Sequence, residues 1–456
     1  MRKAFIKTLG CQMNERDSSN MEGLLLESGY QVTEDPSSAD LILLNTCVIR
    51  QKARQKARSQ IGSFGILKKE KDNLKIGICG CMVTCEANDI FDRFPFVDFV
   101  LGPDRIGELP NVLKALDLGP GKIISDKLHD GPEGSFVRED YVLNERVVSC
   151  FVTAMKGCSN CCSYCVVPMV RGPAVSRPSE EIIDVINGLV GKGVTEVTLL
   201  GQSVNSYLSF SLVNKSELVT FSKLLKQIAA IKGLKRLRFT TSHPRDFSDE
   251  LIEVFGELDI LASHVHLPIQ SGSDAILEGM NRGYTRSWYV DRVNKLRKIR
   301  PDIHISTDII VGFPGESEQD FQDTYNLVNE LSFDHMFIFK YSPRPNTKAN
   351  EFNEGLVPED VKQRRFEAVL KLFESMVLDK HLALVGTTQD ILVEGQSKIG
   401  NDLLTGRTSG NKVVNFSFNG NSSCYKGEWK DLIGQIVPVR ITFGYMHSLK
   451  GQLDNK

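Results

Sequence analysis

Short apolar segments alternate with longer helical stretches along most of the chain, and this alternation constrains the fold more than any other feature. In residues 1–115 the loops between them are short, which is typical of a doubly wound parallel sheet. The predicted strands are Lys3–Leu9, Asp40–Asn45, Leu74–Cys79 and Val97–Leu101, and the predicted helices are Ser19–Glu27 and Gln51–Lys69.

The alternation returns after residue 147 and predicts six further β/α units. Six units are too few for the closed eight-stranded barrel. The predicted strands are Val148–Met155, Glu196–Leu200, Arg236–Thr240, His264–Leu267, His304–Val311 and Met336–Tyr341.

The last part of the chain changes character. A long helix is predicted over Val357–Leu384, and residues 386–445 then form short β-like runs separated by Gly and Asn. Such runs are typical of a small β-barrel, and a plain β-sandwich without a ligand is the alternative. The predicted strands are Asp390–Glu394, Leu403–Thr408, Lys412–Phe416 and Gln435–Phe443.

Length and composition agree with this division. A chain of 456 residues is too long for one ordinary core, and three domains are expected at residues 1–118, 144–378 and 380–447. The formal net charge of −2 excludes a globally basic nucleic-acid binder, although a local basic patch is still possible. No apolar run at the start is long enough for a signal peptide or a membrane span, so we expect a cytoplasmic protein.

The run GCSNCCSYCVVPMVRG, residues 157–172, holds four of the eleven cysteines. Cys158, Cys162 and Cys165 form a CxxxCxxC set, which suits one 4Fe–4S cluster and leaves one iron open. An open iron suits a small ligand with an amine and a carboxylate, such as S-adenosylmethionine (SAM). The alternative is a structural zinc site that also uses Cys161. Spacing alone does not decide whether Cys161 or Cys162 is the cluster ligand.

Three more cysteines share a different pattern. Cys11, Cys47 and Cys81 each lie just past the carboxyl end of a predicted strand. In a parallel sheet those ends share the edge where ligands bind, so the three thiols could hold a second cluster. The alternative is that they are buried small hydrophobic residues, which we expect of Cys79 on the strand itself. An odd number of cysteines without an export signal favours reduced thiols and metal chemistry.

Polar residues follow the strands of the second domain at their carboxyl ends, the rim where chemistry takes place in β/α barrels. Any one of them alone is more often a loop residue that forms hydrogen bonds. A phosphate loop is an alternative interpretation of GFPGE, but the chain has no GxxxxGK[ST] motif. The predicted cofactor-binding residues are Gln202, Asn205, Ser242, Gln270 and Asp308.

The motifs together resemble the MiaB-type branch of the radical SAM methylthiotransferases over residues 3–445. The resemblance rests on TLGCQMNERDS, NTCVIR, GCM and the central cysteine run, and on LLGQSVNSY, FTTSHP, HLPIQSGSD, MNRGYTR, STDIIVGFPGE and GRTSGNKVVNF. It implies a methylthiotransferase N-terminal domain, an open (β/α)6 partial barrel and a TRAM-like RNA-binding barrel. The sequence departs from the family pattern at Met169, Val170, Ser203 and Asn346.

The resemblance also implies an activity. Two 4Fe–4S clusters and SAM would add a methylthio group to C2 of N(6)-dimethylallyladenosine beside the anticodon of tRNA, with an electron donor such as a flavodoxin. The two sets of three cysteines would hold the clusters, and the protein would act as a monomer away from membranes. Alternatives are a methylthiotransferase acting on threonylcarbamoyl-adenosine or on a ribosomal protein aspartate, and a non-catalytic Fe–S protein that binds RNA.

Overall fold

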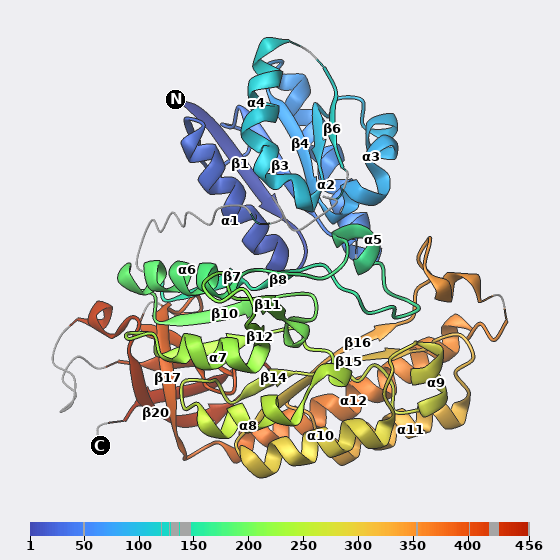
Figure 1. Cartoon of the computed structure of the whole chain (residues 1–456), viewed down its shortest axis with the longest axis vertical. Helices are drawn as coiled ribbons and strands as arrows, with labels where there is room; N and C mark the ends of the chain where they lie inside the picture. The colour runs from blue at the N-terminus through green and yellow to red at the C-terminus, as the bar shows by residue number, and fades with distance from the viewer. Residues whose placement is uncertain are drawn as a thin grey trace.

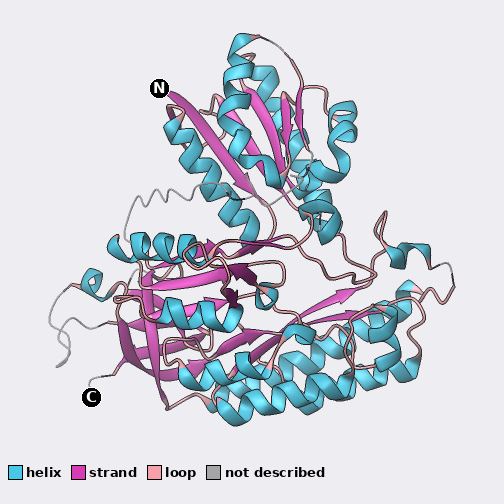
Figure 2. Cartoon of the chain, viewed as in Figure 1, coloured by secondary structure: helices cyan, strands magenta, loops and turns pink. Residues whose placement is uncertain are grey.

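The computed structural model describes residues 1–48, 51–119, 121–126, 128, 136, 147–352, 354–400, 402–418 and 428–454. In the view of Figures 1 and 2, an N-terminal α/β body lies above a partial barrel. The C-terminal part of the chain forms a separate small barrel beside the partial barrel. The predicted domain limit at residue 144 lies outside the described residues.

The N-terminal body is built on a six-stranded parallel sheet with the order β2-β1-β3-β4-β5-β6. All six residues of β3 are buried, because helices cover both faces of the sheet. The predicted doubly wound sheet is therefore confirmed. The strands are β1 (Arg2–Thr8), β2 (Tyr30–Val32), β3 (Leu41–Thr46), β4 (Lys75–Gly80), β5 (Phe99–Leu101) and β6 (Ile123–Ser125).

The helices sort by the face of the sheet that they cover. Helices α1 (Gln12–Glu27) and α4 (Leu109–Leu118) pack on the face that includes Leu41, whereas α2 (Gln51–Glu70) and α3 (Cys81–Arg93) pack on the face that includes Ile42. The strand order reverses between β1 and β3, and such a switch point opens a crevice at the carboxyl ends of the strands.

The second body is an open partial barrel. Two three-stranded parallel sheets, β13-β10-β7 and β14-β15-β16, are joined by a parallel bridge between Leu237 and Leu261. The six predicted strands are confirmed as β7 (Ser149–Thr153), β10 (Glu196–Leu200), β13 (Arg236–Phe239), β14 (His264–His266), β15 (His304–Val311) and β16 (His335–Lys340). The helices over this core are α6 (Ser179–Gly191), α7 (Phe221–Ala229), α8 (Asp249–Glu257), α10 (Arg286–Ile299), α11 (Glu318–Leu331) and α12 (Glu359–Ala383).

The C-terminal body is a closed barrel with the strand order β17-β18-β19-β21-β20. Its last strand was not predicted and lies beyond the expected limit at residue 447, because LKGQL contains Gly and two polar residues and resembles a loop in composition. The strands are β17 (Thr388–Gln396), β18 (Leu403–Thr408), β19 (Val413–Ser417), β20 (Ile436–Gly444) and β21 (Leu449–Leu453). Across the described ranges, every helix is too short or too polar to cross a bilayer.

The turn between β18 and β19 closes the amino-terminal end of the partial barrel. Arg238 donates to the carbonyls of Thr408 at 2.7 Å and Ser409 at 2.9 Å, and the Ser263 amide donates to Ser409 Oγ at 2.8 Å. Arg238 also pairs with buried Glu196 at 2.8 Å. The opposite end of the barrel, where the strands terminate, faces the N-terminal sheet (Figure 1).

Candidate active site

The cysteines of the N-terminal body meet at one edge of its sheet. Strands β1, β3 and β4 are neighbours, and Cys11, Cys47 and Cys81 follow their carboxyl ends. A Cβ on Gly10 would lie 2.8 Å from Cys47 Cβ, and the Cys11 and Cys81 thiols are close enough to interact electrostatically. We call these three residues the N-terminal cysteine set.

Two members of this set occupy helix starts. Cys11 is the N-cap of α1, and Cys81 is the first residue of α3, after Gly80 with a φ of +91°. A Cβ on Gly80 would lie 2.4 Å from Asn45 Oδ1, so the tight entry into α3 requires glycine. Helix N-termini stabilise thiolates, which are the form that binds iron. Burial raises the pKa of the Cys81 thiol, and the adjacent Arg171 guanidinium opposes this rise.

The central cysteine set consists of Cys158, Cys162 and Cys165 in the loop after β8 (Met155–Lys156). Burial raises the pKa of Cys165 to about 11, and the Cys162 and Cys158 thiols contribute to the rise, so the three thiols are neighbours. Cys161 is exposed, and its Sγ lies 3.8 Å from the Ser159 carbonyl oxygen. The geometry therefore favours Cys162 over Cys161 as the third thiol of this set.

Arginine side chains contact one thiol in each set. Arg282 Nη1 lies 3.3 Å from Cys162 Sγ, and Arg171 Nε lies 3.3 Å from Cys81 Sγ. Both arginines are buried. Since Arg171 belongs to the second body and Cys81 to the first, the second contact crosses between them.

The segment that carries the central set reaches the N-terminal set at this junction, because Arg171, six residues after Cys165, contacts Cys81. Burial lowers the pKa of Arg344, and the thiols of Cys165 and Cys47 both oppose this shift. Helix α5 (Val167–Arg171) lies between the sheet edge and the barrel rim (Figure 1). Its Val170 carbonyl accepts from Thr84 Oγ1 on α3 at 3.4 Å.

Gln202, Asn205, Ser242 and Gln270 follow strand ends as predicted, whereas Asp308 lies within β15, three residues before its end. Gln202 Oε1 and Ser242 Oγ are inaccessible to solvent and have no hydrogen-bond partner among the described residues. The backbone is strained beside them, since Thr241 has a φ of +68° and Gln270 a φ of +77°. A polar ligand such as SAM fits this arrangement because it would satisfy the two orphaned oxygens.

Other predicted residues already have partners. Asn205 donates to the His243 carbonyl at 2.8 Å and accepts from the His243 amide at 2.7 Å, so its amide positions the loop that carries Ser242. Asp308 Oδ1 lies 3.6 Å from His266 Nε2. Direct contact of Asn205 and Asp308 with a cofactor stays a prediction.

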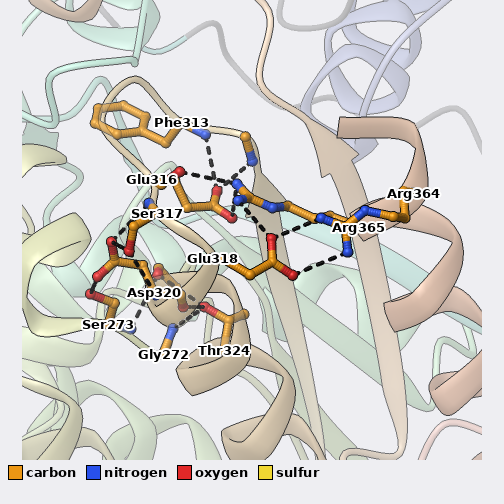
Figure 3. A network of polar contacts seen from close by, with 12 residues as sticks. Gly272, Ser273, Phe313, Glu316, Ser317, Glu318, Asp320, Thr324, Arg364 and Arg365 are labelled. Carbon is orange, nitrogen blue, oxygen red and sulfur yellow. Dashed lines mark hydrogen bonds and ion pairs between the residues drawn. The ribbon is translucent and has the colours of Figure 1, made fainter. Parts of the chain in front are cut away.

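A buried ion pair between Glu316 and Arg365 stabilises the GFPGE turn after β15 (Figure 3). Glu316 accepts hydrogen bonds from the backbone amides of Gly312 and Phe313 and pairs with Arg365 of α12 at 3.1 Å. Burial raises the pKa of Glu316 to about 7, and the Arg365 charge opposes the shift. The carboxylate therefore fixes the backbone of a loop at the rim.

Each cysteine set supplies three thiols. Among the described residues, no group of three His, Cys, Asp or Glu side chains is close enough to hold a single ion. The ligands of a 4Fe–4S cube are spread over its corners, and three thiols per set leave one iron for another ligand.

Asn346 is one of the positions at which the sequence departs from the family pattern. Its φ is +65°, a conformation that asparagine tolerates where the family uses glycine.

Residues that the sequence did not single out complete the site. Arg171 is part of the central cysteine run, and Arg282 is part of MNRGYTR, but neither motif indicates a thiol as the partner. Asn14 and Asp17 of α1 also contact Arg171. The sequence offered one signal for Asn14 and Asp17, which is that both lie in the motif TLGCQMNERDS beside Cys11.

Comparison with family models divides the chain into three parts. Residues 3–102 match an uncharacterised protein family, UPF0004, residues 152–328 match the radical SAM superfamily, and residues 382–453 match the TRAM domain. The matched regions correspond to the three bodies of the structure.

Curated relatives match over nearly the whole chain. A tRNA-2-methylthio-N(6)-dimethylallyladenosine synthase of Syntrophus aciditrophicus is 47% identical over 449 residues, covering 98% of this chain and 94% of that protein. The protein of the same name from Geobacter metallireducens is 46% identical over 450 residues and covers 98% of both chains.

Among solved structures, a radical SAM methyltransferase, TsrM, from Kitasatospora setae with tryptophan and a SAM analogue bound has a TM-score of 0.57. The alignment covers 77% of this chain and 75% of that chain at 15% identity, which shows a shared fold alone.

Proposed function

This chain belongs to the tRNA-2-methylthio-N(6)-dimethylallyladenosine synthase family, and from that premise we propose that it transfers a methylthio group to C2 of N(6)-dimethylallyladenosine beside the anticodon of tRNA. The proposal rests chiefly on one observation, that Arg171 of the segment carrying the central cysteine set contacts Cys81 of the N-terminal cysteine set at the junction of the sheet edge and the barrel rim.

Each set has a distinct task in this proposal. Cys158, Cys162 and Cys165 hold one 4Fe–4S cluster and the N-terminal set holds another. When bound, the first supplies the electron that cleaves SAM and the second supplies the sulfur. The protein binds and orients the reactants, and the target base has to enter between the two sets. Access is feasible because an anticodon-loop base is unpaired and can be splayed into a pocket.

The orphaned oxygens on the rim are proposed SAM contacts. We expect Gln202→Leu and Ser242→Ala each to weaken SAM binding about tenfold, the effect of losing one hydrogen bond of about 1.4 kcal/mol. Equilibrium binding of SAM to the reconstituted protein measures this. Gln227→Leu on the exposed face of α7 is the matched control. Unchanged SAM affinity in both rim variants would rule out these contacts.

The C-terminal barrel is the proposed tRNA contact. The rings of Phe443 and Tyr445 are about half exposed with centroids 4.6 Å apart, and Phe443 is the register partner of exposed Lys450. Aromatic rings beside cationic side chains suit unpaired bases and phosphates. By contrast, the basic run at the start of α2 is partly neutralised, since Arg54 and Arg58 pair with Glu86.

The remaining partners follow from the chemistry. We propose that a small electron-transfer protein such as a flavodoxin reduces the clusters, and that the protein acts in the cytoplasm, where its thiols stay reduced. We also propose that the monomer is the active form, because both cysteine sets belong to one chain.

Nucleoside mass spectrometry of tRNA from a deletion strain and a complemented strain tests the substrate. We expect the deletion to convert 2-methylthio-N(6)-dimethylallyladenosine into N(6)-dimethylallyladenosine and to leave threonylcarbamoyl-adenosine derivatives unchanged. Loss confined to those derivatives, or to a modified ribosomal aspartate, would replace the proposed substrate. Unchanged nucleosides and unchanged ribosomal protein would indicate a non-catalytic protein.

A further inference from the structure

The arginine contacts to the two cysteine sets differ in origin. Arg282 lies in the same body as Cys162 and is held there by the Pro268 carbonyl at 2.8 Å. Arg171 instead reaches Cys81 from the other body, at the end of a helix that begins two residues after Cys165. A single short segment thus carries the thiols of one set and a hydrogen-bond donor for the other.

Arg171 is firmly held in this position. Its side chain is 5% exposed and pairs with Asp17 Oδ2 at 2.8 Å, and Asp17 is itself 3% exposed. The same guanidinium donates to Asn14 Oδ1 at 3.3 Å, an atom that also lies 3.4 Å from Cys11 Sγ. The planar fork of arginine can satisfy Cys81 and α1 together, whereas a lysine ammonium cannot match that geometry.

The two ends of the loop that carries Arg171 are joined by a backbone hydrogen bond. The Cys158 amide donates to the Gly172 carbonyl at 3.1 Å, next to Arg171. Gly157 has a φ of +69°, and a Cβ there would lie 1.9 Å from the Pro173 carbonyl oxygen, so the closure requires glycine at this position. The position of Arg171 is therefore tied to the loop that bears the central cysteine set.

We propose that Arg171 is a positioning residue through which this loop sets the reduction potential of the cluster held by Cys11, Cys47 and Cys81. The inference rests on the proposed function, because it requires the N-terminal set to bind a cluster. A cationic donor on a ligand sulfur stabilises the reduced, more negative cluster and so raises its reduction potential. Burial of Arg171 in a region of low dielectric strengthens this interaction, and removal of Arg171 also leaves the nearby Asp17 carboxylate unpaired, which acts in the same direction.

The experiment isolates the N-terminal cluster in the full-length chain. In a Cys158→Ala/Cys162→Ala/Cys165→Ala background, reconstituted without oxygen, we expect about four irons per chain. Potentiometric titration followed by electron paramagnetic resonance then gives the midpoint potential. Arg171→Met should keep the iron and shift the oxidised-to-reduced equilibrium at least tenfold toward the oxidised cluster, about 59 mV for one electron.

Further variants make the result decisive. Arg93→Met removes an exposed arginine of the N-terminal body that pairs with Asp89, and it should leave the midpoint potential unchanged. Arg171→Lys should keep the iron with a smaller downward shift, and it takes over the test if Arg171→Met loses iron. An unchanged midpoint in the Arg171 variant that holds iron overturns the proposal. A background protein without iron contradicts the proposed function of the N-terminal set instead, whatever residue occupies position 171.

Discussion

Replacing Cys11, Cys47 and Cys81 together with alanine is expected to abolish methylthio transfer while leaving SAM cleavage to 5′-deoxyadenosine intact. The triple variant removes the proposed sulfur site at the sheet edge, whereas Cys158, Cys162 and Cys165 are untouched. Both products can be quantified by mass spectrometry in one reaction with a chemical reductant and tRNA that carries N(6)-dimethylallyladenosine but no methylthio group.

The control for this experiment lies on the same helix as Cys81. Cys85 is one turn further along α3 and belongs to neither set, so Cys85→Ala should retain both activities. Methylthio transfer by the triple variant would contradict the assignment of the sulfur site. Conversely, loss of SAM cleavage as well would show that the two sites do not act separately.

The second large effect concerns stability. Arg365→Met is expected to lower the unfolding free energy of the partial barrel by about 3–5 kcal/mol, because it leaves the buried Glu316 carboxylate unpaired. Urea unfolding followed by Trp288 fluorescence in a Trp429→Phe background reports on this body, since Trp288 lies in α10. The adjacent Arg364→Met is the matched control. Arg365 also pairs with Glu318 at 3.1 Å, and exposed Arg364 pairs with that carboxylate at 2.8 Å (Figure 3). Loss of Arg364 should leave the urea midpoint nearly unchanged.

The size of this loss should depend on pH. Burial raises the pKa of Glu316 to about 7 even beside Arg365, and removal of Arg365 raises the pKa further. A carboxyl whose pKa is higher in the folded protein than in the unfolded chain makes stability fall as pH rises. The difference between Arg365→Met and the parent protein should therefore be larger at pH 8 than at pH 6. An equal loss of unfolding free energy at pH 6 and pH 8 would contradict the presence of a buried, unpaired carboxylate at Glu316.

The order of strands and helices was predictable because burial on both faces produces long apolar runs. The strands Glu196–Leu200 and His304–Val311 have the predicted bounds, and Cys79 is buried on β4 as predicted. Strands β2 and β6, which form the two edges of the six-stranded sheet, were missed. Sheet order gave no local signal either, but the parallel topology was enough to bring Cys11, Cys47 and Cys81 to one edge.

The sequence was enough to propose the thiols of the candidate site, but not the groups around them. Spacing left Cys161 and Cys162 as alternatives, and only the fold shows that Cys161 is exposed. Arg171 could not be assigned from the sequence, since its partners Asp17 and Cys81 lie 154 and 90 residues away. A contact between two bodies depends on how they dock, which no periodicity within either one encodes.

Iron and sulfide analysis of protein prepared without oxygen tests the central claim most directly. Two cubes held by two separate sets require about eight irons and eight sulfides per wild-type chain, and about four of each when either set is replaced by alanine. About four irons in the wild-type chain, all lost with the central set, would show that the sheet edge binds no cluster and would contradict this account.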